Sequence, residues 1–169
     1  VPETAITAET TYTLEVAEGY SLIGEEQEAN PAIKMEYTLV YPVVIVSSTP
    51  AEGGKVEKFS EITIEFNKEV VIEEPSSSYK YVWIDAQGNE TEMKLERIEP
   101  KEVAITSYGY TSTYTVCKKA RFYVDEPVAA EGAYKVQLGN YGWEIFDPIN
   151  TVYLPAKAAI NFEIKVEKL

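Results

Sequence analysis

The sequence predicts an all-β protein, and two observations carry this prediction. Apolar and polar residues alternate over short runs, most clearly at residues 160–166 (INFEIKV). Such alternation places one face of a strand on a core and the other in water. Turn-forming residues separate the runs, and no run has the three- and four-residue apolar spacing of an amphipathic helix. Many short strands between turns are typical of an antiparallel β-sandwich.

The elements follow in chain order. The sequence PAEGG at residues 50–54 predicts a turn before a strand at 62–66. The sequence DAQGN at 85–89 predicts a turn that joins strands at 79–84 and 92–97 into a hairpin, with Gly88 or Asn89 at positive φ. A calcium loop at 85–90 is the alternative, but the segment lacks the regular oxygen spacing of one. The proline-containing segments 99–101 and 125–127 are expected to interrupt the later strands. Two further strands are expected near the C-terminal end, at 133–138 and 160–166.

Two pairs of segments resemble each other within the chain. Residues 9–16 resemble 131–138 at an offset of 122 from Tyr12 to Tyr134, and residues 32–39 resemble 159–166 at an offset of 127 from Glu36 to Glu163. Similar segments in the same order indicate an internal repeat.

This internal similarity predicts the domain organisation. Residues 1–41 are predicted to be the C-terminal strands of a preceding repeat, or an N-terminal β segment docked on the main domain, and residues 42–169 a complete domain. An isolated hairpin is marginal in water, so the first segment is expected to be ordered and to pack its apolar face on a partner.

The composition excludes several classes of function. The net charge is −13, with 28 acidic and 15 basic residues, and such a surface repels nucleic acid and anionic lipid headgroups. No stretch approaches the roughly 18 apolar residues of a membrane span, so no membrane insertion is expected. The chain has no His, which is the commonest general base and transition-metal ligand. The single cysteine, Cys117, lies in a strand-like run and is interpreted as a buried apolar residue.

No motif in the sequence indicates catalysis. The adjacent acids Glu25-Glu26, Glu73-Glu74 and Asp125-Glu126 are interpreted as hydrated pairs, and no Ser or Thr has a His partner. The chain is therefore expected not to be an enzyme and to need no cofactor or metal. The basic cluster of Lys118, Lys119 and Arg121 is interpreted as a solvated strand edge that discourages aggregation.

Aromatic residues beside glycines give the candidate binding residues. Tyr108 and Tyr110 flank Gly109, with Tyr114 nearby, and Tyr141 and Trp143 flank Gly142. Exposed rings on loops can stack on sugar faces and recur at recognition surfaces. The alternative is that these rings belong to the core or to cross-strand pairs. Tyr79, Tyr81 and Trp83 alternate along one predicted strand and are interpreted as core or sheet-face residues.

The segment 47–56 (SSTPAEGGKV), followed by the alternating strand 62–66 and by Asn67-Lys68, resembles a known family. It is similar to the first two strands of bacterial Ig-like domains of surface-layer and other secreted proteins. The closing strands resemble that family too, through 132–136 (GAYKV) and 160–166, in the style of exported modular proteins of Bacteroidetes. The resemblance implies an antiparallel Ig-like β-sandwich. Residues 73–130 exceed a minimal domain of this kind, which predicts extra strands or long loops there.

The resemblance implies a non-catalytic extracellular module. Its expected role is a structural spacer or adhesion repeat of an exported bacterial protein, secreted or on the cell surface, either anchored to the outer membrane or exported to the periplasm. The start at Val1-Pro2 without Met fits a mature or excised fragment. The expected partners are neighbouring domains of the same polypeptide, and a polysaccharide or surface protein. The alternatives are a carbohydrate- or protein-binding module that uses loop aromatics, and an accessory sandwich domain of a carbohydrate-active enzyme.

Overall fold

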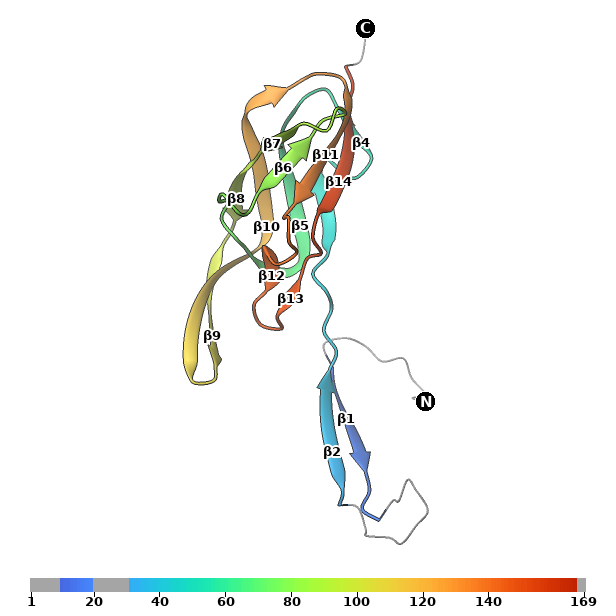
Figure 1. Cartoon of the computed structure of the whole chain (residues 1–169), viewed down its shortest axis with the longest axis vertical. Helices are drawn as coiled ribbons and strands as arrows, with labels where there is room; N and C mark the ends of the chain where they lie inside the picture. The colour runs from blue at the N-terminus through green and yellow to red at the C-terminus, as the bar shows by residue number, and fades with distance from the viewer. Residues whose placement is uncertain (1–9, 20–30, 167–169) are drawn as a thin grey trace. The chain divides into compact units, whose positions relative to one another are not determined.

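The computed structural model describes residues 10–19 and 31–166. These residues divide into two compact units between Tyr41 and Pro42 (Figure 1). Every regular element within the described ranges is a β-strand, and the prediction of an all-β protein is confirmed. Glu25-Glu26 lies outside the described residues, as does the first residue of the predicted segment 9–16.

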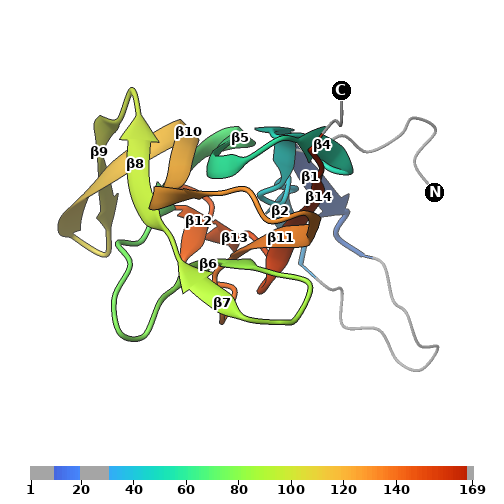
Figure 2. The ribbon, with the colours of Figure 1, turned by 90° about the horizontal axis from the view of Figure 1, so that it is seen from above.

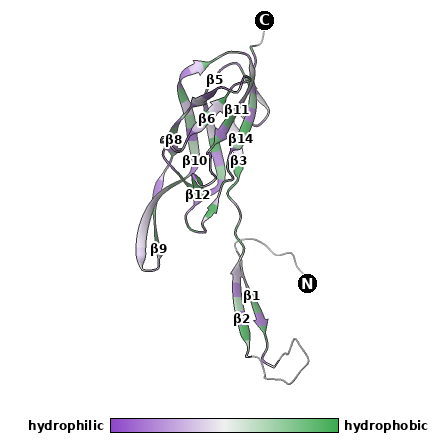
Figure 3. Cartoon of the chain, viewed as in Figure 1, coloured by the Kyte–Doolittle hydropathy of each residue, from purple (hydrophilic) through white to green (hydrophobic). Residues whose placement is uncertain are grey.

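The first unit is a two-stranded antiparallel ladder of β1 (Thr11–Val16) and β2 (Ile33–Thr38). One face is polar, and on it Lys34 lies 3.7 Å from a carboxylate oxygen of Glu15. The other face is apolar. Figure 3 shows hydrophobic positions, in green, along both strands. Leu14 faces Met35 across this ladder, and their exposed fractions are 49% and 40%.

The second unit consists of two sheets that pack face to face (Figures 1 and 2). The first sheet contains β3 (Ile45–Thr49), β5 (Phe59–Ile72), β8 (Lys94–Ile98), β9 (Lys101–Ser107), β10 (Tyr110–Val128), β12 (Ile145–Asp147) and β13 (Val152–Tyr153). The second sheet contains β4 (Gly54–Val56), β6 (Tyr81–Ile84), β7 (Glu90–Glu92), β11 (Gly132–Leu138) and β14 (Ala158–Ile164).

The strand order is that of an immunoglobulin sandwich. In one sheet the order is β3-β5-β10-β8, and in the other β6 pairs with β11, which pairs with β14. This order corresponds to the strands A-B-E-D and C-F-G of the constant-type immunoglobulin fold. The hydroxyl of Tyr134 also donates a 2.8 Å hydrogen bond to the carbonyl of Ala130, in the manner of a tyrosine corner. The predicted antiparallel Ig-like sandwich is confirmed as the fold class.

The core lies between the two sheets and is rich in rings. Phe59 of one sheet lies 4.8 Å from Phe162 of the other, and Tyr81 lies 5.0 Å from Phe122, measured between ring centroids. Fully burying one such side chain stabilises the fold by about 1.5–3 kcal/mol. Cys117 is buried in this core as predicted.

The first sheet extends beyond the sandwich at one end. There β12 pairs with the last residues of β5, and β9 pairs with the first part of β10, from Tyr110 to Val116. The prediction of extra strands within residues 73–130 holds for β9 and the first part of β10. The strands β12 and β13 are additional and lie outside that range. The first part of β10 and the loop before β12 contribute residues to the candidate site described below.

The predicted hairpin at residues 85–89 is present but shorter than expected. The turn joins β6 to β7, and the Asp85 carboxylate accepts hydrogen bonds from the backbone N–H groups of Gln87 and Asn89. The chain then crosses to the other sheet at the buried Met93, because β8 pairs with β10. The strand predicted at 79–84 begins at Tyr81, which leaves Tyr79 in the preceding loop.

Two predictions about β10 are wrong. Residues 125–127 do not end a strand, since they lie within β10 where its register against β5 shifts, and a bulge accommodates Pro127. Nor is the basic cluster at an edge, because β10 lies between β5 and β8. Arg121 instead bridges both neighbours, with ion pairs of 2.5 Å to Glu61 and 2.7 Å to Glu96.

Candidate ligand-binding site

The loop between β11 and β12 is built around one carboxylate. Glu144 is only 1% exposed. Its Oε1 accepts backbone hydrogen bonds from Asn140 (2.6 Å) and Tyr141 (2.8 Å), and its Oε2 accepts from Gly142 (2.9 Å) and Trp143 (3.0 Å). A single acid side chain therefore fixes the backbone that carries both predicted loop aromatics.

The ionised form of Glu144 is favoured by these hydrogen bonds. Burial acts to raise the pKa of Glu144, but the backbone N–H donors outweigh it and hold the pKa below its ordinary value. The backbone can approach the carboxylate only because Gly139 lacks a side chain. A Cβ at Gly139, whose φ is +68°, would lie 2.7 Å from Oε2 of Glu144.

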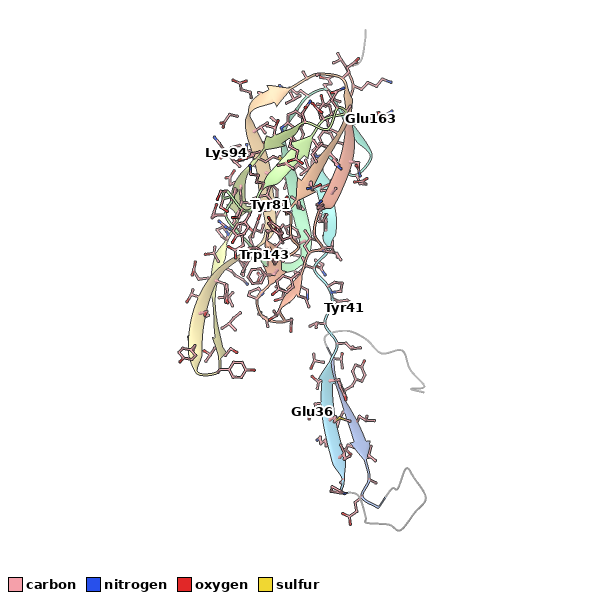
Figure 4. All side chains as sticks on the ribbon, viewed as in Figure 1. Glu36, Tyr41, Tyr81, Lys94, Trp143 and Glu163 are labelled. Atoms are coloured by element: carbon pink, nitrogen blue, oxygen red, sulfur yellow. The ribbon has the colours of Figure 1, made fainter. Side chains whose placement is uncertain are left out.

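The loop presents two aromatic rings and joins them to a third. The ring of Trp143 stacks on Tyr141 at 6.0 Å and 23°, and meets Tyr79 edge-on at 4.6 Å and 84°. Tyr141 is 61% exposed and Trp143 is 41% exposed. Figure 4 shows Trp143 toward the end of the sandwich from which the β9 hairpin extends.

A hollow of about 490 Å³ lies beside this loop, lined by Tyr79, Tyr114 and the end of β5. Tyr114 meets Phe146 of β12 edge-on at 6.1 Å and 88°. Arg97 also lines the hollow; its guanidinium pairs with Glu74 and donates a 2.5 Å hydrogen bond to the carbonyl of Ile72. The Nε of Arg97 is buried and has no acceptor within the described ranges.

The four predicted residues form two separate pairs. Tyr108 and Tyr110 lie at the turn of the β9–β10 hairpin and are 99% and 81% exposed. Tyr141 and Trp143 contact each other, whereas no ring contact between described residues joins either of them to the hairpin pair. The exposure excludes the alternative of core rings for Tyr108 and Tyr110.

Sequence reasoning missed most of the hollow. Tyr79 was expected on a strand, but Pro75 and the following serines give the signal of a loop there. Glu73-Glu74 was interpreted as a hydrated pair, although Glu74 pairs with Arg97. Tyr114 was noted beside the glycine-flanked tyrosines, but nothing local in the sequence places it beside Arg97, because only strand pairing brings the two together.

Other chemistry is sparse in the described part of the chain. Within residues 10–19 and 31–166, no cluster of three or more His, Cys, Asp or Glu is arranged to hold a metal ion. Among the same residues, no helix has the length and apolar character needed to cross a membrane. A second buried acid, Asp147, pairs with Lys68 at 3.3 Å and accepts the backbone N–H of Ile149 at 2.9 Å.

No protein-family model matches the chain, and no curated protein sequence matches it significantly. The class that the structure itself defines is an all-β sandwich with immunoglobulin-like strand order.

Proposed function

We propose that the protein is a non-catalytic module of an exported, multidomain bacterial protein, in which it acts as a structural spacer or adhesion repeat. Its partners in this role are neighbouring domains of the same polypeptide. The secreted or cell-surface location and the bacterial origin rest on the resemblance of residues 47–68 to bacterial Ig-like domains.

The observation that carries the proposal is a correspondence between two ladders. The internally similar segments lie on β1 and β2 in one unit and on β11 and β14 in the other, and both pairs are antiparallel. Tyr12 lies opposite Tyr37, whereas the matching Tyr134 lies opposite Phe162. Because Phe162 matches Met35 and not Tyr37, the register of the two ladders differs by two residues. A shift of two residues leaves each matched side chain on the same face of its ladder.

The difference in burial between the matching apolar faces of the two ladders supports a tandem arrangement of repeats. In the second unit, Tyr134, Val136 and Ile160 are buried against the opposite sheet. In the first unit, the matching Leu14 and Ile33 are 49% and 45% exposed. A two-stranded ribbon with one apolar face is half of a sandwich, and it requires a second sheet to be stable. We infer that this second sheet belongs to a preceding repeat.

A non-catalytic role is supported by how the buried acids are used. The carboxylates of Glu144 and Asp147 accept hydrogen bonds from loop backbone groups, and both pKa values lie below their ordinary range. For Asp147, burial opposes ionisation, and hydrogen bonds led by the Asn150 side chain outweigh it. Such acids are permanently ionised near neutral pH and poorly suited to be general acids.

The test is the sequence of the complete reading frame on both sides of residues 1–169. We expect an upstream segment that supplies the strands of a sandwich ending in β1 and β2, with further copies beyond. In a protein extended by that segment, amide exchange in β1 and β2 should slow by about tenfold or more, as burial in a cooperative unit requires. Exchange in residues 132–164 serves as the internal control. A catalytic domain directly upstream, with no such strands, would refute the proposal.

A ligand-binding module is the second candidate, and the aromatic loop favours it. Its rings are held by a buried acid and remain accessible, whereas a pure spacer has no need of such a loop. This candidate does not exclude the first, since an adhesion repeat is also a binding module.

A further inference from the structure

We propose that the hollow beside Tyr79 and Tyr114 is a binding site for a neutral oligosaccharide. The inference goes beyond the spacer role and gives the ligand-binding candidate a place and a ligand class. The volume of about 490 Å³ falls within the roughly 300–1,000 Å³ of typical small-molecule sites.

The rings around the hollow suit the apolar face of a pyranose. The C–H groups on one face of a sugar ring carry partial positive charge, which the negative face of an aromatic ring attracts. Tyr79, Trp143 and Tyr141 form one chain of contacting rings, and Tyr114 contacts Phe146 in a second. Because Tyr79 and Tyr114 both line the hollow, it adjoins both groups of rings.

Polar groups in the hollow suit a ligand rich in hydroxyls. The Glu74 side chain is 67% exposed while it pairs with Arg97, so its carboxylate keeps acceptor capacity toward the hollow. Glu73 adds a second carboxylate, and Arg97 adds a donor. A sugar hydroxyl both donates and accepts hydrogen bonds, so neighbouring hydroxyls can satisfy carboxylate and guanidinium together.

The charge balance selects a neutral ligand. Two carboxylates and one guanidinium line the hollow, and Glu74 already neutralises the guanidinium. The chain as a whole carries a net charge of −13. An acidic sugar or a phosphate would be repelled here, whereas neutral hydroxyls meet no such penalty.

The residue types that line the site favour a sugar over a peptide. A peptide is anchored mainly by an apolar side chain in a deep pocket or by strand addition at a free sheet edge. This hollow instead combines partly exposed rings with three charged groups, Glu73, Glu74 and Arg97. Glu144 also fixes the backbone of Trp143, whose ring contacts Tyr79 of the hollow, and this pre-organisation reduces the ordering cost of binding.

The test is calorimetric titration of the 169-residue protein with neutral gluco-, xylo- and manno-hexasaccharides, and with oligogalacturonate as the acidic counterpart. We expect at least one neutral series to bind and the acidic one not to bind. Indole fluorescence should change on binding, because Trp143 adjoins the site, and the change should disappear in Trp143→Phe. The other tryptophan, Trp83, is buried in the core and serves as the reference.

Two substitutions on the same strand form a matched pair. Tyr114→Ala should weaken binding about tenfold, as expected for losing one stacking ring. Tyr110→Ala removes an exposed ring from the hairpin tip and should leave binding unchanged. If Tyr114→Ala fails to fold, Glu74→Gln provides the second variant, since this exposed side chain can lose its charge without opening the core.

Three outcomes would overturn the inference. They are a complete lack of binding to the neutral series, preferential binding of the acidic oligomer, and neutral binding that Tyr114→Ala and Glu74→Gln both leave intact. Selection of a peptide from a display library, with loss on Tyr114→Ala, would assign the hollow to a different ligand class. Each outcome is independent of the upstream sequence, which alone tests the tandem-repeat proposal.

Discussion

At the scale of single residues, the acids of this protein do structural work that their positions in the sequence do not reveal. Glu144 lies in a loop among glycines and aromatics, where hydration is the default expectation for a carboxylate. The structure buries it and surrounds it with backbone donors. This arrangement resembles a capping interaction made by one side chain for a whole loop, and it predicts sensitivity to both substitution and pH.

Glu144→Gln should destabilise the sandwich by about 2 kcal/mol or more, since each buried donor left without an acceptor costs about 1–3 kcal/mol. The amide nitrogen of Gln cannot accept the hydrogen bonds of Gly142 and Trp143 that Oε2 accepts. Urea unfolding at pH 7 measures the loss, with the exposed Glu126→Gln as the control.

The same residue predicts a pH dependence. The pKa of Glu144 in the folded state lies below the ordinary value of about 4.3. The contribution of Glu144 to folding stability is therefore complete above about pH 4.3 and is lost as the pH falls below that value. Stability of the natural sequence should therefore fall on acidification below about pH 4.3, and Glu144→Gln should reduce that fall. An unchanged pH profile in the variant would contradict the assigned role.

Cys117 should be unreactive in the folded protein. It is buried in the core, and burial raises the pKa of its thiol, so little thiolate forms and reagent access is blocked. A thiol-specific chromogenic reagent should label it only as fast as the sandwich unfolds, and mild denaturant should accelerate labelling. Rapid stoichiometric labelling of the native protein at pH 8 would show that the site opens locally.

At the scale of elements, the entry of the chain into the sandwich depends on one asparagine. Asn67 Oδ1 accepts the N–H of Val44 at 3.0 Å, and Asn67 Nδ2 donates to the carbonyl of Pro42 at 2.9 Å. Its own backbone N–H donates to the carbonyl of Val44 at 3.1 Å. Asn67, the residue after the predicted strand 62–66, thus holds the segment that precedes β3. These contacts give a structural role to the Asn67-Lys68 pair of the sequence pattern at residues 47–68.

Asn67→Ala should lower the unfolding free energy by about 1–2 kcal/mol, because two hydrogen bonds of about 0.5–1.5 kcal/mol each are lost. Amide exchange at Val44 should accelerate more than exchange at Val136 in the core. Asn67→Asp is the informative companion, because it keeps the acceptor for Val44 and loses the donor to Pro42. Equal acceleration at both amides would indicate global unfolding instead of local release.

Elements also show where local pattern fails. Alternation identified the strand at 62–66, which lies within β5, and the strand at 133–138, which lies within β11. It also identified the last strand, predicted at 160–166, although β14 ends at Ile164. It could not show that Pro127 lies in a bulge, or that Arg121 lies on a central strand between two acidic neighbours. Both depend on which strands become neighbours, and strand pairing is not encoded in a local window.

At the scale of the whole molecule, the second unit contains a complete core of its own. The cluster of buried side chains runs from Val43 to Ile164 and includes no described residue of the first unit. The stability of the sandwich should therefore not depend on β1 and β2.

Removal of residues 1–41 should leave the melting temperature of the remaining sandwich within about 2 °C, because 1 kcal/mol shifts the melting temperature by roughly 4–8 °C in domains of about 60–100 residues and roughly 2–4 °C in domains of about 150–250 residues. Differential scanning calorimetry of the two proteins under identical conditions checks this. A larger drop would show that the first unit contributes to the stability of the second, and would favour an N-terminal segment docked on the main domain.

The sequence by itself determined the all-β class, the closing strands, the burial of Cys117 and the exclusion of His-based chemistry. These follow from residue type and from periods of two residues, which a local window contains. Only the tertiary structure decided that Tyr108 and Tyr110 lie apart from Tyr141 and Trp143, and that Tyr79, Arg97 and Tyr114 share one hollow. Those residues come from different strands and a loop, so their meeting depends on long-range pairing between β5, β8 and β10.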